Sequence, residues 1–362
     1  MKIESKIKDY CVEIKDNVLM KKEEVFFEEK YRKLYFFIDE NVFNIYKEKI
    51  LIFVGDSEYL VIPAQEDKKD YLQLAEYYKC LIDKGFMRTD ILVTIGGGIL
   101  QDLSGFIAST LYRGLKWVFL PTTLLAQADS CIGSKTSINF SDSKNLIGSF
   151  YPPDKIFIDP EFCMTLTKEY FNSGVGELIK FHLMDNDKSY VLLRKFIFST
   201  DTEQKNVLKE IILSNLEIKK SYFAEDEFDS GRRNLLNYGH CFGHALESAS
   251  NFEVCHGEAV IVGMSFADLL ALHRGFMSKE KYDEYQLIYD RHYPNFGMQK
   301  VSVQQLIDEL KKDKKRVGKD LTMILSKDIG EQKKFDDITE EEIVCVYNEF
   351  LKKYSKYKRI GV

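Results

Sequence analysis

The chain has 362 residues, a formal net charge of -6 and an apolar fraction of 45%. This length suggests two domains, and the apolar content is sufficient for a core in each. The acidic balance argues against nucleic-acid binding through bulk positive charge, and no apolar run approaches the length of a membrane span. The seven scattered cysteines include no CxxC pair, so we expect reduced thiols in a cytoplasmic protein.

The first part of the chain alternates short apolar runs with polar helical patterns. Runs rich in β-branched and aromatic residues predict buried strands at 34–38, 50–54, 59–62, 91–95, 117–120 and 155–158. Residues 71–84 have helical periodicity and end before Gly85. Strands that alternate with helices predict a parallel, doubly wound sheet, which we assign to an α/β domain over residues 1–160.

A glycine-rich turn follows the predicted strand at 91–95. It reads Gly96-Gly97-Gly98 and leads into a predicted helix with Asp102 in its first turns. Free backbone N–H groups at such a helix N-terminus can hold a phosphate. The turn is neither GxGxxG nor a Walker loop, so a plain strand-to-helix turn is equally compatible with it.

Two further polar segments follow in this domain. Thr122 and Thr123 come after the strand at 117–120 and carry hydroxyls that could bind a ribose or a pyrophosphate. The stretch 129–150 then combines small polar residues with Lys135 and Lys144. We expect a folded loop that grips an anionic ligand there, with a solvated surface loop as the alternative.

Beyond about Phe162 the pattern changes to long amphipathic helices, and we assign residues 161–362 to a second, helical domain with one strand at 321–325. Glu177 lies among apolar neighbours on a predicted helix. A buried carboxylate is costly unless a cation or a metal ion accompanies it. Lys180 shares the same helix face, so an ordinary ion pair is the alternative to a metal site.

Three of the six histidines lie within residues 240–256. His240 and His244 are four residues apart, which places them on one face of a helix. His256 follows a turn-like stretch and precedes Gly257. Clustered neutral imidazoles bind metals or act as acid and base groups, whereas a hydrogen-bonded core pair is the structural alternative.

The ordered motifs of the chain resemble the 3-dehydroquinate synthase family, within the sugar phosphate cyclase superfamily. They read GGGILQDLSGF, YRGLKWVFLPTTLLAQADS, GSKTSIN, KNLIGSFYPP, GELIK, NLLNYGHCFGHALE and CHGEAVIVGM and occur in the family order over most of the chain. The resemblance implies a Rossmann-like α/β N-terminal domain and an all-α C-terminal domain. It also implies a homodimeric carbon–oxygen lyase with NAD and Zn²⁺ (or Co²⁺) as cofactors.

The implied reaction converts 3-deoxy-D-arabino-heptulosonate 7-phosphate into 3-dehydroquinate and phosphate. Transient oxidation by NAD is followed by phosphate elimination, reduction and aldol closure. We therefore expect a small sugar phosphate as the partner. We expect neither a nucleic acid nor a membrane as a partner.

The resemblance also implies roles for individual residues. The metal ligands are Glu177, His240 and His256. The NAD contacts are Asp39, Asn41, Glu66, Lys69, Gly97, Gly98, Asp102, Thr122, Thr123, Asp129, Lys135, Lys144, Phe162 and Thr165. The catalytic and substrate contacts are Asp129, Lys135, Asn145, Lys180, Lys219, Arg233, Asn237, His244 and Lys315. Arg113 is implied to reach the phosphate pocket of a neighbouring subunit.

Other members of the superfamily are the main alternatives. Asn237 and His244 favour dehydroquinate synthesis over the 2-deoxy-scyllo-inosose and sedoheptulose 7-phosphate cyclases, which differ in this stretch. Gln101, Ser134 and Asp229 depart from the family pattern, which leaves the substrate open. A metal-dependent polyol dehydrogenase needs no comparable cluster of lysine and arginine, and a non-catalytic relative would be expected to lose a metal ligand.

Overall fold

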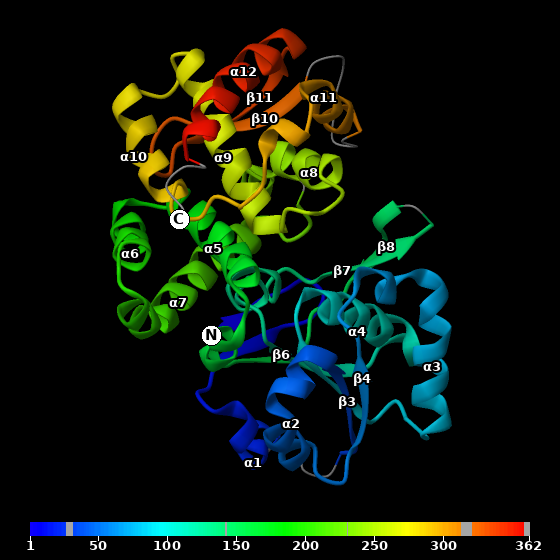
Figure 1. The fold of residues 1–362 in the computed structure, drawn as a ribbon. Helices are drawn as coiled ribbons and strands as arrows, with labels where there is room; N and C mark the ends of the chain where they lie inside the picture. Colours follow the sequence, from blue (N-terminus) through cyan, green and yellow to red (C-terminus); the bar gives the residue numbers. More distant parts are fainter. Residues whose placement is uncertain (27–31, 142, 230, 313–320, 358–362) are drawn as a thin grey trace. The chain divides into compact units, whose positions relative to one another are not determined.

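The computed structural model describes residues 1–26, 32–141, 143–229, 231–312 and 321–357, with the side chains of 355–357 left aside (Figure 1). The chain divides into two compact units, Met1–Leu166 and Thr167–Val362. We predicted the boundary between residues 160 and 161, slightly earlier in the chain. None of the described helices combines the length and apolar character needed to cross a membrane.

The N-terminal unit is built on a seven-stranded sheet with the order β1-β2-β9-β6-β5-β3-β4. Its strands are β1 (Lys2–Ile3), β2 (Tyr10–Ile14), β3 (Leu34–Asp39), β4 (Glu58–Ile62), β5 (Ile91–Gly96), β6 (Lys116–Pro121) and β9 (Lys155–Ile158). All neighbours pair in parallel except β1, which is antiparallel to β2. The parallel sheet is as predicted, and its carboxyl ends carry the glycine turn.

Helices cover both faces of this sheet (Figure 1). They are α1 (Lys22–Val25), α2 (Glu40–Val54), α3 (Leu74–Asp83) and α4 (Gly98–Thr110). On one face, Phe36 of β3 packs with Phe53 of α2. On the other, Phe37 of β3 lies 6.0 Å from Tyr77 of α3, measured between ring centroids. Successive strand residues point to opposite faces, so a sheet buried on both sides has continuous apolar strands.

The strand predicted at 50–54 is wrong, because these residues form the last turns of α2. Ile50, Phe53 and Val54 are buried, whereas Leu51 and Ile52 are 40% and 67% exposed. The buried positions therefore follow the helical spacing of three and four residues. A short apolar run does not by itself distinguish a strand from a helix segment.

The loop predicted at 129–150 is also wrong in its secondary structure. After a short π-helix (Ala126–Ser130), the chain forms an antiparallel hairpin of β7 (Lys135–Phe140) and β8 (Ser143–Phe150). Most residues of β8 are exposed. The strand therefore lacks the apolar alternation that marks a half-buried strand in a sequence, and its backbone pairing with β7 defines it.

The C-terminal unit is helical, with one added hairpin. Its helices are α5 (Lys168–Leu183), α6 (Asp187–Ile197), α7 (Asp201–Glu225), α8 (His240–Ala249), α9 (His256–His273), α10 (Lys279–Tyr289), α11 (Val303–Lys311) and α12 (Glu340–Tyr357). β10 (Leu321–Ser326) pairs with β11 (Gln332–Ile338), which confirms the strand expected at 321–325. Helix α9 is buried along most of its length and packs against α5, α8, α10 and α12.

Glycines allow α9 to approach its neighbours closely. A Cβ atom on Gly176 of α5 would lie 2.2 Å from the carbonyl oxygen of Gly257 at the start of α9. A Cβ atom on Gly263 would lie 1.9 Å from the carbonyl oxygen of Gly239, which precedes α8 and has φ +76°. Side chains at these positions would push the helices apart. The helices that carry Glu177, His240 and His256 can therefore meet backbone to backbone.

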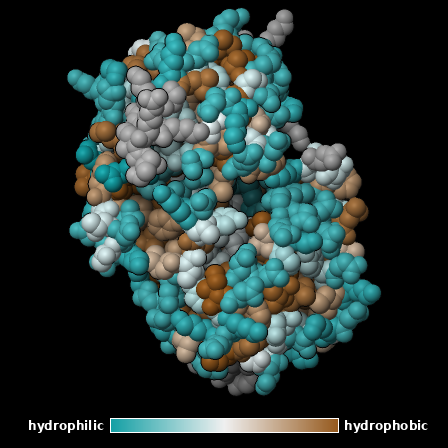
Figure 2. All heavy atoms as spheres, in the orientation of Figure 1, coloured by the Kyte–Doolittle hydropathy of each residue, from teal (hydrophilic) through white to brown (hydrophobic). Residues whose placement is uncertain are grey.

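The surface is mainly hydrophilic on the face that Figure 2 presents, with apolar side chains gathered in patches. Charged residues make up 30% of the sequence. Exposed apolar side chains include Ile45 and Ile52 of α2, at 54% and 67%. Exposed apolar side chains are common on folded proteins, because polar atoms do not suffice to cover the whole surface.

Candidate functional site

In the C-terminal unit, Glu177, His240 and His256 converge from three helices. Glu177 lies on α5 and is fully buried, while His240 and His256 are the first residues of α8 and α9. The Oε1 atom of Glu177 is 3.4 Å from Nε2 of His240 and 3.4 Å from Nε2 of His256. One carboxylate oxygen therefore lies equally close to two imidazole nitrogens.

These distances fit a tetrahedral metal ion. Bonds of about 2.1 Å in a tetrahedral set place two ligand atoms about 3.4 Å apart. The Oε1 atom of Glu177 is buried and has no hydrogen-bond partner among the described residues, and a buried polar atom of this kind requires compensation. Three protein ligands also leave one position for a substrate oxygen, as in catalytic zinc sites. The residues present suit a divalent metal ion.

His244 is a second candidate for the third ligand. Ring nitrogens of His240, His244 and His256 lie within 4.8 Å of one another. However, the side chain of His244 is 58% exposed. Glu177 lies closer to both other histidines and is buried, so we favour Glu177 as the ligand and leave His244 beside the site.

Two partners orient the ligand histidines, and neither was predicted. Nδ1 of His256 lies 3.3 Å from Oε2 of Glu247, and Nδ1 of His240 lies 3.2 Å from the carbonyl oxygen of Tyr238. An acceptor at Nδ1 holds the proton there and presents Nε2 to a metal. Glu247 follows His244 by three residues, so helical spacing was the available signal for it.

The three proposed ligands differ in the direction of their pKa shifts. Burial opposes the charge of Glu177, but Lys180 and the neighbouring imidazoles lower its pKa well below the usual range. Burial, reinforced by Lys180, lowers the pKa of His240. Burial also opposes charge on His256, yet the carboxylates of Glu177 and Glu247 raise its pKa to about 10. Without metal, His256 is therefore the ligand that holds a proton at neutral pH.

Further predicted residues of this unit are cationic and buried. Lys180 on α5 is 2% exposed, and its Nζ atom lies 2.5 Å from Oε2 of Glu177. Lys219 on α7 is 6% exposed. Arg233, in the 3-10 helix Arg232–Asn237, is 7% exposed and donates from Nη1 to the carbonyl oxygen of Glu227 at 2.5 Å.

Two predicted residues of this unit remain. The amide of Asn237 donates from Nδ2 to the carbonyl oxygen of Asn234 at 2.8 Å, within its own turn. Lys315 lies outside the described residues.

In the N-terminal unit, several predicted NAD residues meet at the carboxyl ends of neighbouring strands. Gly97 caps α4, which begins at Gly98, and a Cβ atom on Gly97 would meet Cγ2 of Thr123 at 2.9 Å. A Cβ atom on Gly98 would meet nothing within 4 Å, which leaves open space at the helix N-terminus. Thr122 has a buried hydroxyl without a hydrogen-bond partner among the described residues.

Asp39 ends β3 on the same edge of the sheet. Its Oδ1 atom accepts hydrogen bonds from the backbone N–H groups of Asn41 and Val42 at the start of α2. The observed role of Asp39 is thus a helix cap. The open N-terminus of α4, beside the hydroxyls of Thr122 and Thr123, suits the pyrophosphate of a dinucleotide.

A polar network joins other predicted residues. Nζ of Lys69 lies 2.8 Å from Oδ2 of Asp102 and 3.4 Å from Oε1 of Glu66. It also donates to Oδ1 of Asn145 at 2.8 Å. Asp102 accepts from the hydroxyl of Ser137 at 2.7 Å. The structure therefore brings Asn145, predicted for the substrate, together with three residues predicted for NAD.

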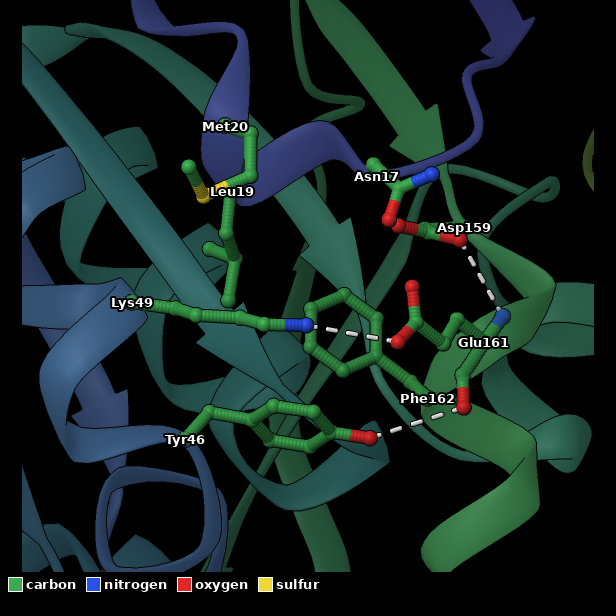
Figure 3. A pocket seen from close by; sticks show the side chains of 8 residues that line it. All are labelled: Asn17, Leu19, Met20, Tyr46, Lys49, Asp159, Glu161 and Phe162. Atoms are coloured by element: carbon green, nitrogen blue, oxygen red, sulfur yellow. Dashed lines mark hydrogen bonds and ion pairs between the residues drawn. The ribbon is translucent and has the colours of Figure 1, made fainter.

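Phe162 and Thr165 lie around Tyr46 of α2. The rings of Phe162 and Tyr46 are 5.2 Å apart between centroids, and the hydroxyls of Tyr46 and Thr165 are 3.1 Å apart. Phe162 is 3% exposed and belongs to the core. A small hollow beside it is lined by Lys49 and Glu161, whose charges pair at 3.3 Å (Figure 3). This hollow contains no residue of the glycine turn.

The remaining predicted residues of this unit lie at its surface or half-buried. Arg113 is exposed and has φ +63°. Asp129 is half-buried in the π-helix. Lys135 and Lys144 are exposed on the two strands of the hairpin.

Comparison with known proteins shows the family. The N-terminal model of 3-dehydroquinate synthase matches residues 59–173, and the C-terminal model matches residues 174–316. A 3-dehydroquinate synthase of Streptococcus pyogenes serotype M3 is 35% identical over 333 residues, which cover 91% of this chain and 92% of that protein.

Solved structures show the same fold. A 2-epi-5-epi-valiolone synthase from Streptomyces hygroscopicus subsp. jinggangensis 5008, with NAD⁺ and Zn²⁺ bound, has a TM-score of 0.85 at 24% identity and covers 97% of this chain and 99% of its own. A 2-deoxy-scyllo-inosose synthase complexed with carbaglucose-6-phosphate, NAD⁺ and Co²⁺ has a TM-score of 0.83 at 24% identity, with coverage of 96% and 99%. From the two family models and the relative that matches nearly the whole chain, we conclude that this protein belongs to the 3-dehydroquinate synthase family.

Proposed function

We propose that this protein is a 3-dehydroquinate synthase, a phosphate-eliminating sugar phosphate cyclase. The observation that carries the proposal is the match to a 3-dehydroquinate synthase at 35% identity over 91% of the chain. The Glu177, His240 and His256 group supports it, because a metal-assisted cyclase needs ligands with an open position. The substrate would be 3-deoxy-D-arabino-heptulosonate 7-phosphate.

Glu177, His240 and His256 would hold Zn²⁺ or Co²⁺, the ions that the two similar cyclase structures contain. When bound, such an ion acts as a Lewis acid that lowers the pKa of a coordinated hydroxyl. Glu247 and the carbonyl oxygen of Tyr238 would keep both imidazoles in the ligand tautomer. The ligand side chains would thus be oriented before the metal ion binds.

NAD would bind over the glycine turn. When bound, it accepts a hydride from the substrate and later returns it. Gly97 and Gly98 would let the pyrophosphate approach the N-terminus of α4, and Thr122 would offer its buried hydroxyl. The other proposed contacts are Asp39, Asn41, Glu66, Lys69, Asp102, Thr123, Lys144, Phe162 and Thr165.

Cationic side chains would hold the phosphate and carboxylate ends of the substrate. Lys180, Lys219 and Arg233 are each less than 10% exposed. A charge with little access to water interacts strongly with an anion, and two fixed anionic ends position the reacting carbons between them. Asp129, Lys135, Asn145, Asn237 and Lys315 complete the proposed substrate contacts.

His244 would act beside the metal ligands. Its ring centroid is 5.2 Å from that of His240, and its side chain is largely exposed. It could hold phosphate or carry a proton between substrate and solvent. We further propose a cytoplasmic homodimer in which Arg113 reaches the phosphate pocket of the second subunit.

The test is phosphate release from three substrates in parallel: 3-deoxy-D-arabino-heptulosonate 7-phosphate, glucose 6-phosphate and sedoheptulose 7-phosphate. We expect turnover with the first, with product far exceeding the NAD supplied and no matching rise in NADH absorbance. Faster release from another sugar phosphate would refute the dehydroquinate assignment. Stoichiometric NADH would indicate a dehydrogenase instead.

A further inference from the structure

Asn139 is a buried amide on β7, in a hairpin whose second strand, β8, is largely exposed. It lies near the end of β7 and is 7% exposed. The pairing of β7 with β8 shifts its register between Ile138 and Phe140, and there Asn139 forms an isolated parallel bridge with Asp70. The backbone of β7 therefore contacts the segment around residues 66–70 at this point.

The side chain of Asn139 uses both ends of its amide. Nδ2 donates to the carbonyl oxygen of Glu66 at 3.1 Å and to Oε1 of Glu66 at 2.9 Å. Oδ1 accepts from the backbone N–H of Asn145 at 2.9 Å. A backbone carbonyl only accepts and a backbone N–H only donates, so these partners determine the orientation of the amide.

The bond to Asn145 supports an unusual backbone conformation. Asn145 has φ +53°, in the left-handed region, which asparagine adopts more readily than other non-glycine residues. Its side-chain oxygen then accepts from Nζ of Lys69 at 2.8 Å and lies 2.8 Å from the hydroxyl oxygen of Ser137. Asn139 thus helps to set the position of the residue that contacts Lys69.

We propose that Asn139 is a positioning residue that couples the β7–β8 hairpin to the 66–69 segment, which carries proposed NAD contacts. The proposal rests on the assignment of Glu66, Lys69 and Asp102 to NAD made above. Through Asn145 and Glu66, Asn139 links the 66–69 segment to the hairpin that carries Lys135, Lys144 and Asn145. Ordering of either segment then favours ordering of the other.

The test compares Asn139→Asp with Asn139→Ala, and both with Asn206→Asp as a control. Asn139→Asp keeps the shape but turns a carboxylate oxygen toward two acceptors on Glu66. Asn206 is exposed on α7 and does not belong to this hydrogen-bonded network, so its change to Asp adds the same charge as a control. NAD affinity is measured by calorimetry, and amide exchange is measured for segments 66–70 and 135–150 with and without NAD.

We expect both Asn139 variants to bind NAD at least about fivefold more weakly, which corresponds to one neutral hydrogen bond of about 1 kcal/mol. Both segments should exchange faster in the variants, and KM for the sugar phosphate should rise more than kcat falls. A lower Tm with unchanged NAD affinity and unchanged exchange would overturn the proposal, because a purely structural role predicts that result.

Wild-type protein provides a second test that does not depend on variant folding. NAD should protect segments 66–70 and 135–150 together, and protection of 66–70 alone would overturn the coupling. Amide exchange of wild type and the Asn139 variants can also be compared without NAD, and this comparison requires no substrate. A wild-type protein that binds no NAD would refute the proposed function, and the proposed coupling would still be tested by exchange in the NAD-free variants.

Discussion

Metal binding should release one proton, and His256 should be its source. In the metal-free protein the carboxylates of Glu177 and Glu247 raise the pKa of His256 to about 10. Glu177 is ionised and His240 neutral at neutral pH, because their pKa values are lowered. A metal ligand must be deprotonated, so the ion competes with a proton on His256.

The size of the effect follows from linkage. While pH stays below the pKa of His256, each pH unit should tighten the apparent metal affinity about tenfold. From pH 6.5 to 8.5 the affinity for Co²⁺ should therefore rise about hundredfold. This pH range lies below the pKa of His256, so the slope should be constant across it.

The assay is competition with a chromophoric chelator across this pH range, together with calorimetry in two buffers that differ in ionisation enthalpy. Calorimetry should give about one proton released per metal ion at pH 7.5. In Glu247→Gln the pKa of His256 should fall, because one of its two carboxylate partners becomes neutral. The affinity of this variant should level off at a lower pH. A metal affinity that does not change between pH 6.5 and 8.5 would refute the reasoning.

Glu247→Ala should weaken metal binding by about 10- to 100-fold at pH 8.5, because the carboxylate that orients His256 is lost. Glu253 has an exposed side chain, and Glu253→Ala should match wild type in the same chelator assay. Gly257→Ala should reduce metal content measured by atomic absorption, since its Cβ would lie 1.8 Å from the carbonyl oxygen of Ser173 and separate α5 from α9. Burial raises the pKa of Asp268 to about 7, above its unfolded value near 3.8, so its ionisation should reduce stability as pH rises from about 4 to 7. Asp268→Asn should therefore flatten the fall in Tm over pH 5 to 7.5, and parallel Tm profiles would contradict this.

Hydrophobic periodicity predicts much of the fold. The runs at 34–38 and 91–95 form β3 and β5, because strands buried on both faces consist of continuous β-branched and aromatic residues. The prediction for 50–54 is wrong, since the helical character of this run depends on which of its apolar residues α2 buries. The hairpin of β7 and β8 escapes prediction because backbone pairing, rather than an apolar pattern, defines it.

The sequence predicts some residues of the candidate site and not others. Residue type and spacing alone single out His240, His244 and His256 as a metal or acid–base group, because few other side chains suit that chemistry. Glu177 is singled out as a carboxylate among apolar neighbours, with an ion pair to Lys180 as the alternative, and the family resemblance assigns it as the third ligand. Helical spacing places Glu247 beside His244. Its contact with His256 and the contacts of Asn139 depend on which segments the fold brings within hydrogen-bonding distance.

The sequence by itself therefore determined the family, the parallel sheet with its glycine turn, and the set of chemical groups available. Only the tertiary structure decided that Glu177 lies 3.4 Å from two imidazoles and that His244 is exposed. The physical reason is close helix packing: Gly176 and Gly257 let α5 and α9 touch through their backbones. Contacts of this kind depend on distances between segments that are far apart in the chain, and a pattern of neighbouring residues does not contain them.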